Sequence, residues 1–252
     1  MESNRLDGKV AIVTGAIGEI GAASAALMAA RGARIVAIDR PGSDFAALRN
    51  SVSGDPLCLE ADVTDEAGVA ASIAATVAHF GRIDILFNNA GIEGPVEPLA
   101  TYSLEAFRKV MAVNVEGVFL GMKHALPHMV RQQSGSVINA SSLAGLCGAA
   151  GMVAYNTSKH AVIGLTRVAA LEVAGHGVRV NCINPGPIAG RMIDRLDAET
   201  GVSAEFRAGL IPAQRYGTPQ EVAAVVAFLA SDDARYINAS IHSIDGGLNA
   251  IA

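Results

Sequence analysis

The chain has 252 residues, of which 51% are hydrophobic and 17% are charged, and its formal net charge is −5 at pH 7. This length suits one α/β domain better than two small ones, so we expect residues 1–252 to form a single domain. The mildly acidic balance, with no basic run, argues against nucleic acid or an anionic membrane surface as a partner.

The amino-terminal segment is polar, and no apolar stretch reaches the length that spans a membrane, so we expect a cytoplasmic protein. The three cysteines, Cys58, Cys147 and Cys182, are widely spaced, and we expect them to be buried small hydrophobic residues. His124 and His128 lie four residues apart on a predicted helix, but no clustered carboxylates accompany them. We therefore expect no metal site.

Short apolar runs rich in β-branched residues alternate with longer segments of helical pattern. The runs predict strands at 10–13, 34–38, 57–60, 83–87, 136–139, 178–183 and 240–244. The intervening segments predict helices around 19–31, 65–80, 104–131, 152–175 and 219–230. This alternation predicts a Rossmann-like, doubly wound parallel sheet of about seven strands, with helices on both faces. Ligands of such sheets bind beyond the carboxyl ends of the strands.

A glycine-rich turn, TGAIGEIG at 14–21, follows the first predicted strand and opens a helix. Glycines permit a tight turn and close backbone approach, and the helix amino terminus offers N–H groups to a pyrophosphate. We therefore predict cofactor contacts from Gly15, Gly18, Ile20 and Gly21. An ordinary strand-to-helix turn is the alternative for a glycine cluster taken alone.

Asp39 ends the second predicted strand, at the separation from the glycine turn that dinucleotide-binding folds require. Its carboxylate can accept hydrogen bonds from both ribose hydroxyls, and its charge repels a 2′-phosphate, so NAD is expected rather than NADP. The adjacent Arg40 leaves NADP open, because an arginine there can accommodate the phosphate.

Polar residues also follow the third and fourth predicted strands. Asp62 and Val63 end the third strand, and Asn89, Ala90 and Gly91 follow the fourth. Asp and Asn are common turn formers, so each position alone has an ordinary structural explanation. Successive strand ends with such groups favour a dinucleotide site, and we predict cofactor contacts from these five residues.

Tyr155 and Lys159 lie four residues apart on a predicted helix, thirteen and seventeen residues after Ser142. Residues at this spacing share a helix face, so the phenol and the ammonium can occupy one pocket. Two unit charges about 4 Å apart interact by roughly 4 kcal/mol at an effective dielectric near 20. We therefore expect the cation to lower the phenol pKa from about 10 toward working pH, as hydride-transfer chemistry needs. Packing and solvated-surface roles are the alternatives for each residue taken singly.

These motifs resemble those of the short-chain dehydrogenase/reductase family across essentially the whole chain. The resemblance rests on the glycine turn, Asp62, the NNAG segment, Asn114, Ser142, Tyr155 with Lys159, Pro185-Gly186 and the carboxyl-terminal DGG. It implies that Tyr155 is the general acid/base, and that Lys159 lowers its pKa and holds the nicotinamide ribose. It implies that Ser142 binds the substrate oxygen and that Asn114 supports a water in a proton relay. Further cofactor contacts are implied for Pro185, Gly186 and Ile188.

The sequence departs from the family pattern at two positions. Glu19 stands where the family has a glycine, and it puts a carboxylate near the phosphates. We expect it to be tolerated if it points to solvent and to weaken cofactor binding if it faces the pyrophosphate. Gly190 stands where the family often has a threonine that contacts the nicotinamide carboxamide.

By the same resemblance, segments 91–101, 143–152 and 185–218 line the substrate side, the last of them as a lid. Their mainly small and apolar composition predicts a small, uncharged secondary alcohol or ketone, with cyclic compounds among the candidates. The expected substrate-binding residues are Ser142, Leu143, Met152, Tyr155 and Met192; Ile92, Ile188, Glu93 and Arg191 are further candidates.

Two alternative functions stay open. One is an NADP-linked 3-oxoacyl carrier-protein reductase, which Asp39 and the lack of an evident basic docking surface disfavour. The other is a cofactor-binding regulatory protein with little catalytic activity, against which the intact catalytic residues argue. The apolar helices around 104–131 and 152–175 resemble the family's subunit contacts, which implies a homotetramer.

Overall fold

The computed structural model describes residues 5–251, and these form one parallel sheet of seven strands in the order β3-β2-β1-β4-β5-β6-β7. Its strands are β1 (Val10–Thr14), β2 (Arg34–Asp39), β3 (Leu57–Glu60), β4 (Ile85–Asn88), β5 (Gly135–Ala140), β6 (Val178–Pro185) and β7 (Ile241–Ile244). The strand order reverses between β1 and β4, which is the topological switch point where ligands of such sheets bind.

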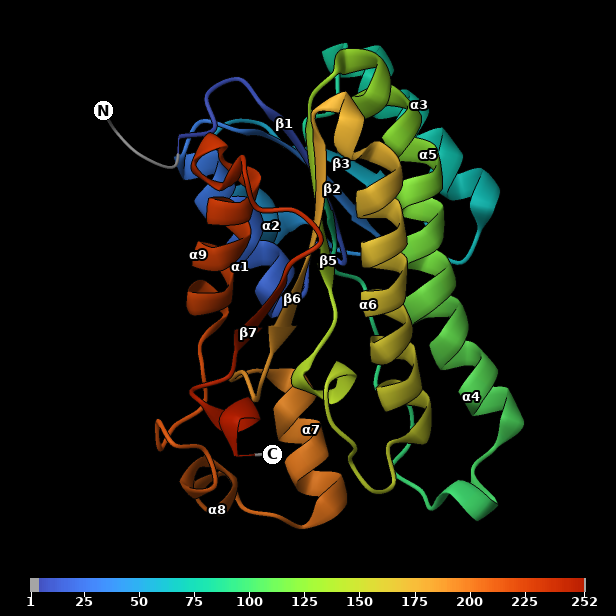
Figure 1. The fold of residues 1–252 in the computed structure, drawn as a ribbon, viewed down its shortest axis with the longest axis vertical. Helices are drawn as coiled ribbons and strands as arrows, with labels where there is room; N and C mark the ends of the chain where they lie inside the picture. Colours follow the sequence, from blue (N-terminus) through green and yellow to red (C-terminus); the bar gives the residue numbers. More distant parts are fainter. Residues whose placement is uncertain (1–4, 252) are drawn as a thin grey trace.

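Helices cover both faces of the sheet. The helices of the described chain are α1 (Glu19–Ala30), α2 (Ala46–Ser51), α3 (Glu66–Phe80), α4 (Leu104–Met111), α5 (Gly117–Gln132), α6 (Val153–Val173), α7 (Arg191–Thr200), α8 (Ala204–Gly209) and α9 (Pro219–Ala230). Figure 1 shows α1, α2 and α9 on one side of the sheet and α3, α5 and α6 on the other. The predicted Rossmann-like, doubly wound parallel sheet is confirmed.

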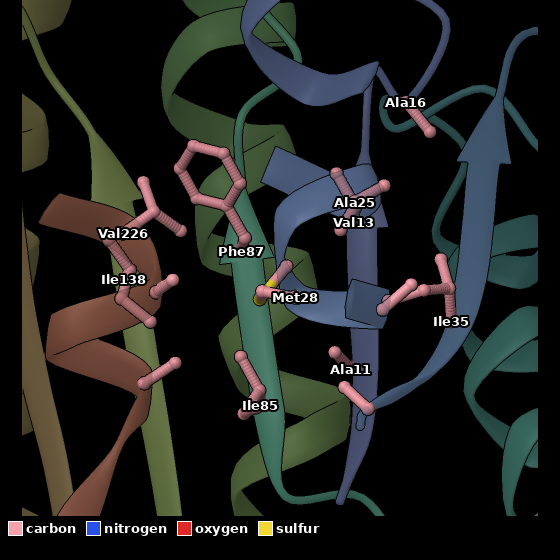
Figure 2. Close-up of a cluster of buried hydrophobic side chains, with 14 of the residues drawn as sticks. Ala11, Val13, Ala16, Ala25, Met28, Ile35, Ile85, Phe87, Ile138 and Val226 are labelled. Carbon is pink, nitrogen blue, oxygen red and sulfur yellow. The ribbon is translucent and has the colours of Figure 1, made fainter. Parts of the chain in front are cut away.

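Successive residues of β1 point into two separate hydrophobic clusters. Ala11 and Val13 pack in a cluster with α1 and α9, whereas Val10 and Ile12 belong to a cluster with α3, α5 and α6. Figure 2 shows the first cluster, in which Phe87 of β4 is fully buried. Because side chains alternate across a strand, a sheet covered on both faces needs continuous apolar runs, and this explains the strand pattern in the sequence.

Local capping fixes where several helices begin and end. The Asp65 carboxylate accepts hydrogen bonds from two N–H groups of the first turn of α3, and Gly81 closes that helix with φ +76°. Thr218 and Glu221 form a reciprocal capping box at the start of α9. Such caps satisfy the N–H groups that a helix end leaves without partners.

Three helical features differ from the sequence-based expectations. The predicted helix at 104–131 is α4 and α5, joined by a π-helical turn at Ala112–Glu116. The six-residue helix α2 is too short for its hydrophobic periodicity to be recognised. The segment 185–218, for which no helix is predicted, contains the helices α7 and α8.

The cysteines are only partly as expected. Cys182 in β6 is buried, but Cys58 and Cys147 are only partly buried, so the expectation is wrong for these two. Cys58 lies on the edge strand β3, and Cys147 lies in the connection after β5, where neither is covered on all sides. Within residues 5–251, no cluster of His, Cys, Asp or Glu is placed to hold a metal ion, and no helix could cross a membrane.

Candidate active site

The glycine turn is held closely against the segment that follows β4. The Thr14 hydroxyl accepts hydrogen bonds from the N–H groups of Asn89 and Ala90, at 3.0 and 3.2 Å. The Asn89 amide in turn donates to the carbonyls of Thr14 and Gly15, both at 3.1 Å. Sequence reasoning overlooked Thr14, although a hydroxyl at the end of a strand beside a glycine turn is a recognisable signal.

Two glycines of the turn are required by close packing. Gly15 has φ +62°, and a Cβ there would lie 2.9 Å from the Ala90 Cα. At Gly21 a Cβ would lie 2.2 Å from the Gly15 carbonyl oxygen, a steric clash that excludes any side chain at this position. Gly18 is the N-cap of α1 and supplies no side-chain cap, and Ile20 packs against the first hydrophobic cluster. The uncapped amino terminus of a twelve-residue helix fits the pyrophosphate of a dinucleotide.

Asp39 lies beside this turn and is buried. Its carboxylate accepts hydrogen bonds from the Ile17 N–H at 3.0 Å, the Arg40 N–H at 2.9 Å and the Ser43 hydroxyl at 3.2 Å. Three donors therefore hold one carboxylate at the end of β2, next to the first turn of α1. This placement fits the ribose-binding position of a dinucleotide fold.

Asp62, Val63 and Gly91 surround the same end of the sheet. The Asp62 carboxylate is fixed by the Thr64 N–H and hydroxyl, at 2.9 and 2.8 Å. Val63 packs closely on Gly117 of α5, where a Cβ would lie 2.9 Å from the Val63 Cγ2. A Cβ on Gly91 would lie 3.4 Å from the Lys159 Nζ, so the fourth strand end reaches the predicted catalytic lysine.

Tyr155 and Lys159 share one face of α6, as predicted. The Lys159 Nζ lies 5.5 Å from the centre of the Tyr155 ring and donates to the Ala140 carbonyl at 2.9 Å. Lys159 is buried, and burial lowers its pKa to about 8. A buried ammonium beside a phenol at a strand end is the arrangement that the spacing of the two residues predicts.

The expected lowering of the Tyr155 pKa is wrong for this arrangement. Burial raises the pKa of Tyr155 to about 12; a hydrogen bond with Ser142 acts against this increase, and the charge of Glu93 adds to it. The free-energy cost of removing the phenolate from water is therefore larger than the stabilisation that the Ser142 hydrogen bond provides. The Lys159 ammonium lies over the Tyr155 ring and donates its hydrogen bond to the Ala140 carbonyl, not to the phenol oxygen.

Ser142 lies at the end of β5, on the same side of the sheet as Tyr155. Its hydroxyl accepts from the Ala144 N–H at 3.2 Å and lies 3.5 Å from the Pro185 carbonyl, and the Asn184 amide donates to the Ser142 carbonyl at 2.6 Å. These contacts join the ends of β5 and β6 and fix the serine close to the phenol.

Asn114 is fully buried in the π-helical turn between α4 and α5. Its side-chain oxygen accepts from the Ile92 N–H at 2.8 Å, and its amide donates to the Ile92 carbonyl at 2.8 Å and the Ser158 hydroxyl at 2.9 Å. The side chain therefore ties the connection after β4 to helix α6. This positions the backbone next to Lys159 and Tyr155.

The remaining predicted site residues lie around the ends of β5 and β6. Pro185 ends β6, and a Cβ on the next residue, Gly186, would lie 2.9 Å from the Asp245 Cα. Ile188 pairs with Gly217 in an isolated parallel bridge. The close contact at Gly186 explains why the carboxyl-terminal DGG motif belongs to this end of the sheet.

The predicted substrate residues come from three separate elements. Leu143 begins a 3-10 turn after β5, Met152 is the N-cap of α6, and Met192 lies in α7 with 44% of its surface exposed. Glu93 is partly buried; burial raises its pKa to about 7, and the neighbouring Arg195 partly opposes that rise. The charge of Glu93 adds to the raised pKa of Tyr155.

Comparison with known proteins identifies relatives that match nearly the whole chain and share its fold. The profile of a family described as enoyl-(acyl carrier protein) reductase matches residues 15–249. Levodione reductase from Leifsonia aquatica is 41% identical, over 98% of this chain and 97% of that protein. A crystal structure of levodione reductase has a TM-score of 0.95 and covers 98% of this chain and 100% of that one. A crystal structure of NAD+-bound xylitol dehydrogenase is 35% identical with a TM-score of 0.91, over 96% and 99% of the two chains.

Proposed function

Because the chain belongs to the short-chain dehydrogenase/reductase family, we propose that it transfers hydride between NAD(H) and a small, uncharged secondary alcohol or ketone. The observation that carries the proposal is the meeting of Ser142, Tyr155 and buried Lys159 at the carboxyl edge of the sheet, beside the glycine turn. The similarity to levodione reductase supports a cyclic substrate.

A bound nicotinamide supplies the hydride acceptor for alcohol oxidation and the hydride donor for ketone reduction. In the proposed oxidation, Ser142 orients the reacting oxygen and Tyr155 takes the hydroxyl proton at that oxygen. Tyr155 must be in its phenolate form to take that proton, and the Lys159 ammonium is proposed to stabilise this phenolate. In the reverse direction Tyr155 returns the proton to the carbonyl oxygen.

The cofactor is proposed to bind along the edge formed by β1, β2 and β4. The first turn of α1 and Gly15, Gly18, Ile20 and Gly21 would hold the pyrophosphate, and Asp39 would accept from the ribose hydroxyls. Other proposed cofactor contacts are Asp62, Val63, Asn89, Ala90, Gly91, Tyr155, Lys159, Pro185, Gly186 and Ile188. The NAD+-bound relative supports NAD as the cofactor.

Apolar side chains favour an uncharged substrate. Leu143, Met152 and Met192 are the apolar residues proposed to line the substrate side, and Glu93 is a titratable group whose charge acts on Tyr155. A carboxyl with a pKa of about 7 can donate or accept a hydrogen bond near neutral pH. A phosphorylated carrier substrate would instead need a basic surface at the entrance.

A panel of cyclic and linear secondary alcohols and ketones, assayed with NAD(H) and NADP(H), tests the proposal. We expect wild-type protein to oxidise at least one alcohol faster with NAD than with NADP. In Asp39→Asn the carboxylate charge is lost but an acceptor oxygen stays, so the NAD/NADP preference should fall by about 10- to 100-fold, since charge-assisted hydrogen bonds contribute about 1.5–3 kcal/mol.

Asp44→Asn is the matched control, because Asp44 is exposed on the connection after β2 and caps the Ala46 N–H. It should leave the cofactor preference unchanged. Absence of turnover with every pair of substrate and cofactor would favour a regulatory protein. A preference for NADP together with a carrier-bound 3-oxoacyl substrate would replace the proposal with the reductase alternative.

We also propose a homotetramer. Exposed apolar side chains lie on α4, α5 and α6, and they include Leu104, Phe119, Val168 and Leu171. Light scattering should give about four chain masses, and Leu171→Glu should give a smaller species, because a charge in an apolar interface is costly. Phe206→Glu on the separate helix α8 is the control, and a wild-type monomer would refute the assignment.

A cytoplasmic location is proposed as well, since the three cysteines are free thiols.

A further inference from the structure

The two positions that depart from the family pattern contact each other. Glu19 is the first residue of α1, and Gly190 immediately precedes α7, more than 170 residues later in the chain. A Cβ at Gly190 would lie 3.1 Å from the Glu19 Cγ and 3.2 Å from its Cδ. Gly190 also has φ +149°, a conformation that favours glycine. The missing side chain at Gly190 therefore makes room for the extra one at Glu19.

Glu19 binds the start of α7 through Arg191. One Glu19 carboxylate oxygen accepts from the Arg191 Nε at 2.7 Å and from the Arg191 backbone N–H at 3.3 Å. Gly190 provides no side-chain cap to α7, so Glu19 supplies one from another element. Burial alone would raise the pKa of Glu19, but hydrogen bonds from Arg191 and from its own backbone hold it below the usual value. The carboxylate is thus ionised and engaged by the lid.

Arg191 keeps part of its hydrogen-bonding capacity. Its side chain is 77% exposed, and among the described residues its guanidinium donates only through Nε, to Glu19. Hydrogen bonding to Glu19 raises the pKa of Arg191, and the charge of Asp39 adds to this effect. Arg191 therefore contacts the first residue of α1 and is close enough to the Asp39 carboxylate for the two charges to interact. These are the two places assigned to the pyrophosphate and the ribose.

We propose that Arg191 binds the diphosphate of the dinucleotide from the lid side, and that Glu19 is the positioning residue that holds its guanidinium there. This inference rests on the proposed function, which places the diphosphate at the first turn of α1. An ionised Glu19 at that turn would repel the diphosphate unless a cation compensates it. Arg191 supplies that cation, and a guanidinium fixed through one edge can offer its other N–H groups to phosphate oxygens.

Equilibrium titration with ADP and with adenosine tests the proposal without any assay of turnover. Arg191→Met should weaken ADP binding by about tenfold, or about 1.4 kcal/mol, and change adenosine binding by less than about twofold. Adding Glu19→Gln to Arg191→Met should restore about threefold or more of the ADP affinity, because the uncompensated carboxylate is gone. The single arginine variant should therefore bind ADP more weakly than the double variant.

Arg195→Met is the matched control. Arg195 lies on the same helix, is exposed, and pairs with Glu199 of that helix at 2.7 Å, so its removal takes the same charge from the lid. It should leave ADP affinity unchanged. An Arg191→Met variant with wild-type ADP affinity, or with equal losses for ADP and adenosine, would overturn the inference while the proposed function stands. Failure of wild-type protein to bind ADP would overturn both.

Discussion

Replacing Tyr155 with phenylalanine should lower the turnover of a secondary alcohol by about 10²- to 10⁴-fold, the usual contribution of general acid–base catalysis. The substitution removes only the hydroxyl that is proposed to carry the proton. The phenyl ring keeps the packing of a partly buried side chain on α6, so the thermal unfolding midpoint should change little. NAD affinity should stay within a few fold, because the Tyr155 hydroxyl is only one of many proposed cofactor contacts. Steady-state kinetics and NAD titration on the same preparation provide the test.

Tyr236→Phe is the control for this result. Tyr236 is fully exposed, and it follows the 3-10 turn after α9, outside the proposed site. Removal of its hydroxyl should leave turnover unchanged. If Tyr155→Phe keeps more than about a tenth of wild-type turnover, a water or another side chain must transfer the proton, and the mechanism is wrong.

The strands and the nature of the site could be predicted because both depend on short-range patterns. Residues 10–13 of β1 and 35–38 of β2 are continuously apolar and buried, since a sheet covered on both faces buries the middle of its strands. The residues of the glycine turn are close together in sequence, and Tyr155 and Lys159 are only four residues apart. Local geometry therefore determines much of the arrangement within each motif.

Other features depend on contacts that the sequence alone does not reveal. The contact of Glu19 with Arg191 joins residues that are 172 positions apart. The π-helical turn that holds Asn114 breaks a segment that has helical periodicity throughout. Both features place side chains of the site, and both depend on how the elements pack together rather than on local preference.

The Tyr155 pKa is raised where the sequence predicts that it is lowered, because burial outweighs the interaction with the nearby charge. The spacing of Tyr155 and Lys159 is compatible with a strong charge interaction, but that interaction depends on where the ammonium points. The Lys159 Nζ is hydrogen-bonded to the Ala140 carbonyl and lies 5.5 Å from the centre of the Tyr155 ring. Burial is then the largest influence on each group, raising the phenol pKa to about 12 and lowering the ammonium pKa to about 8. Activation of the phenol in the proposed reaction therefore requires the ammonium to interact more strongly with the phenolate than it does in this arrangement.

Lys159→Met should accordingly change the pH dependence of alcohol oxidation as well as its rate. Oxidation needs the phenolate, so the rate rises with pH up to the Tyr155 pKa. Because the proposed mechanism requires the Lys159 ammonium to reach the phenolate during the reaction, loss of this cation should move the operative Tyr155 pKa upward. We expect a rise displaced by about two pH units, with a rate at pH 7 lower by about 100-fold, since one pKa unit corresponds to 1.36 kcal/mol. Lys123→Met, which removes an exposed lysine that pairs with Glu66 at 2.6 Å, should leave the profile unchanged. A Lys159→Met profile with the wild-type midpoint would mean that Lys159 acts through cofactor binding or structure and does not stabilise the phenolate.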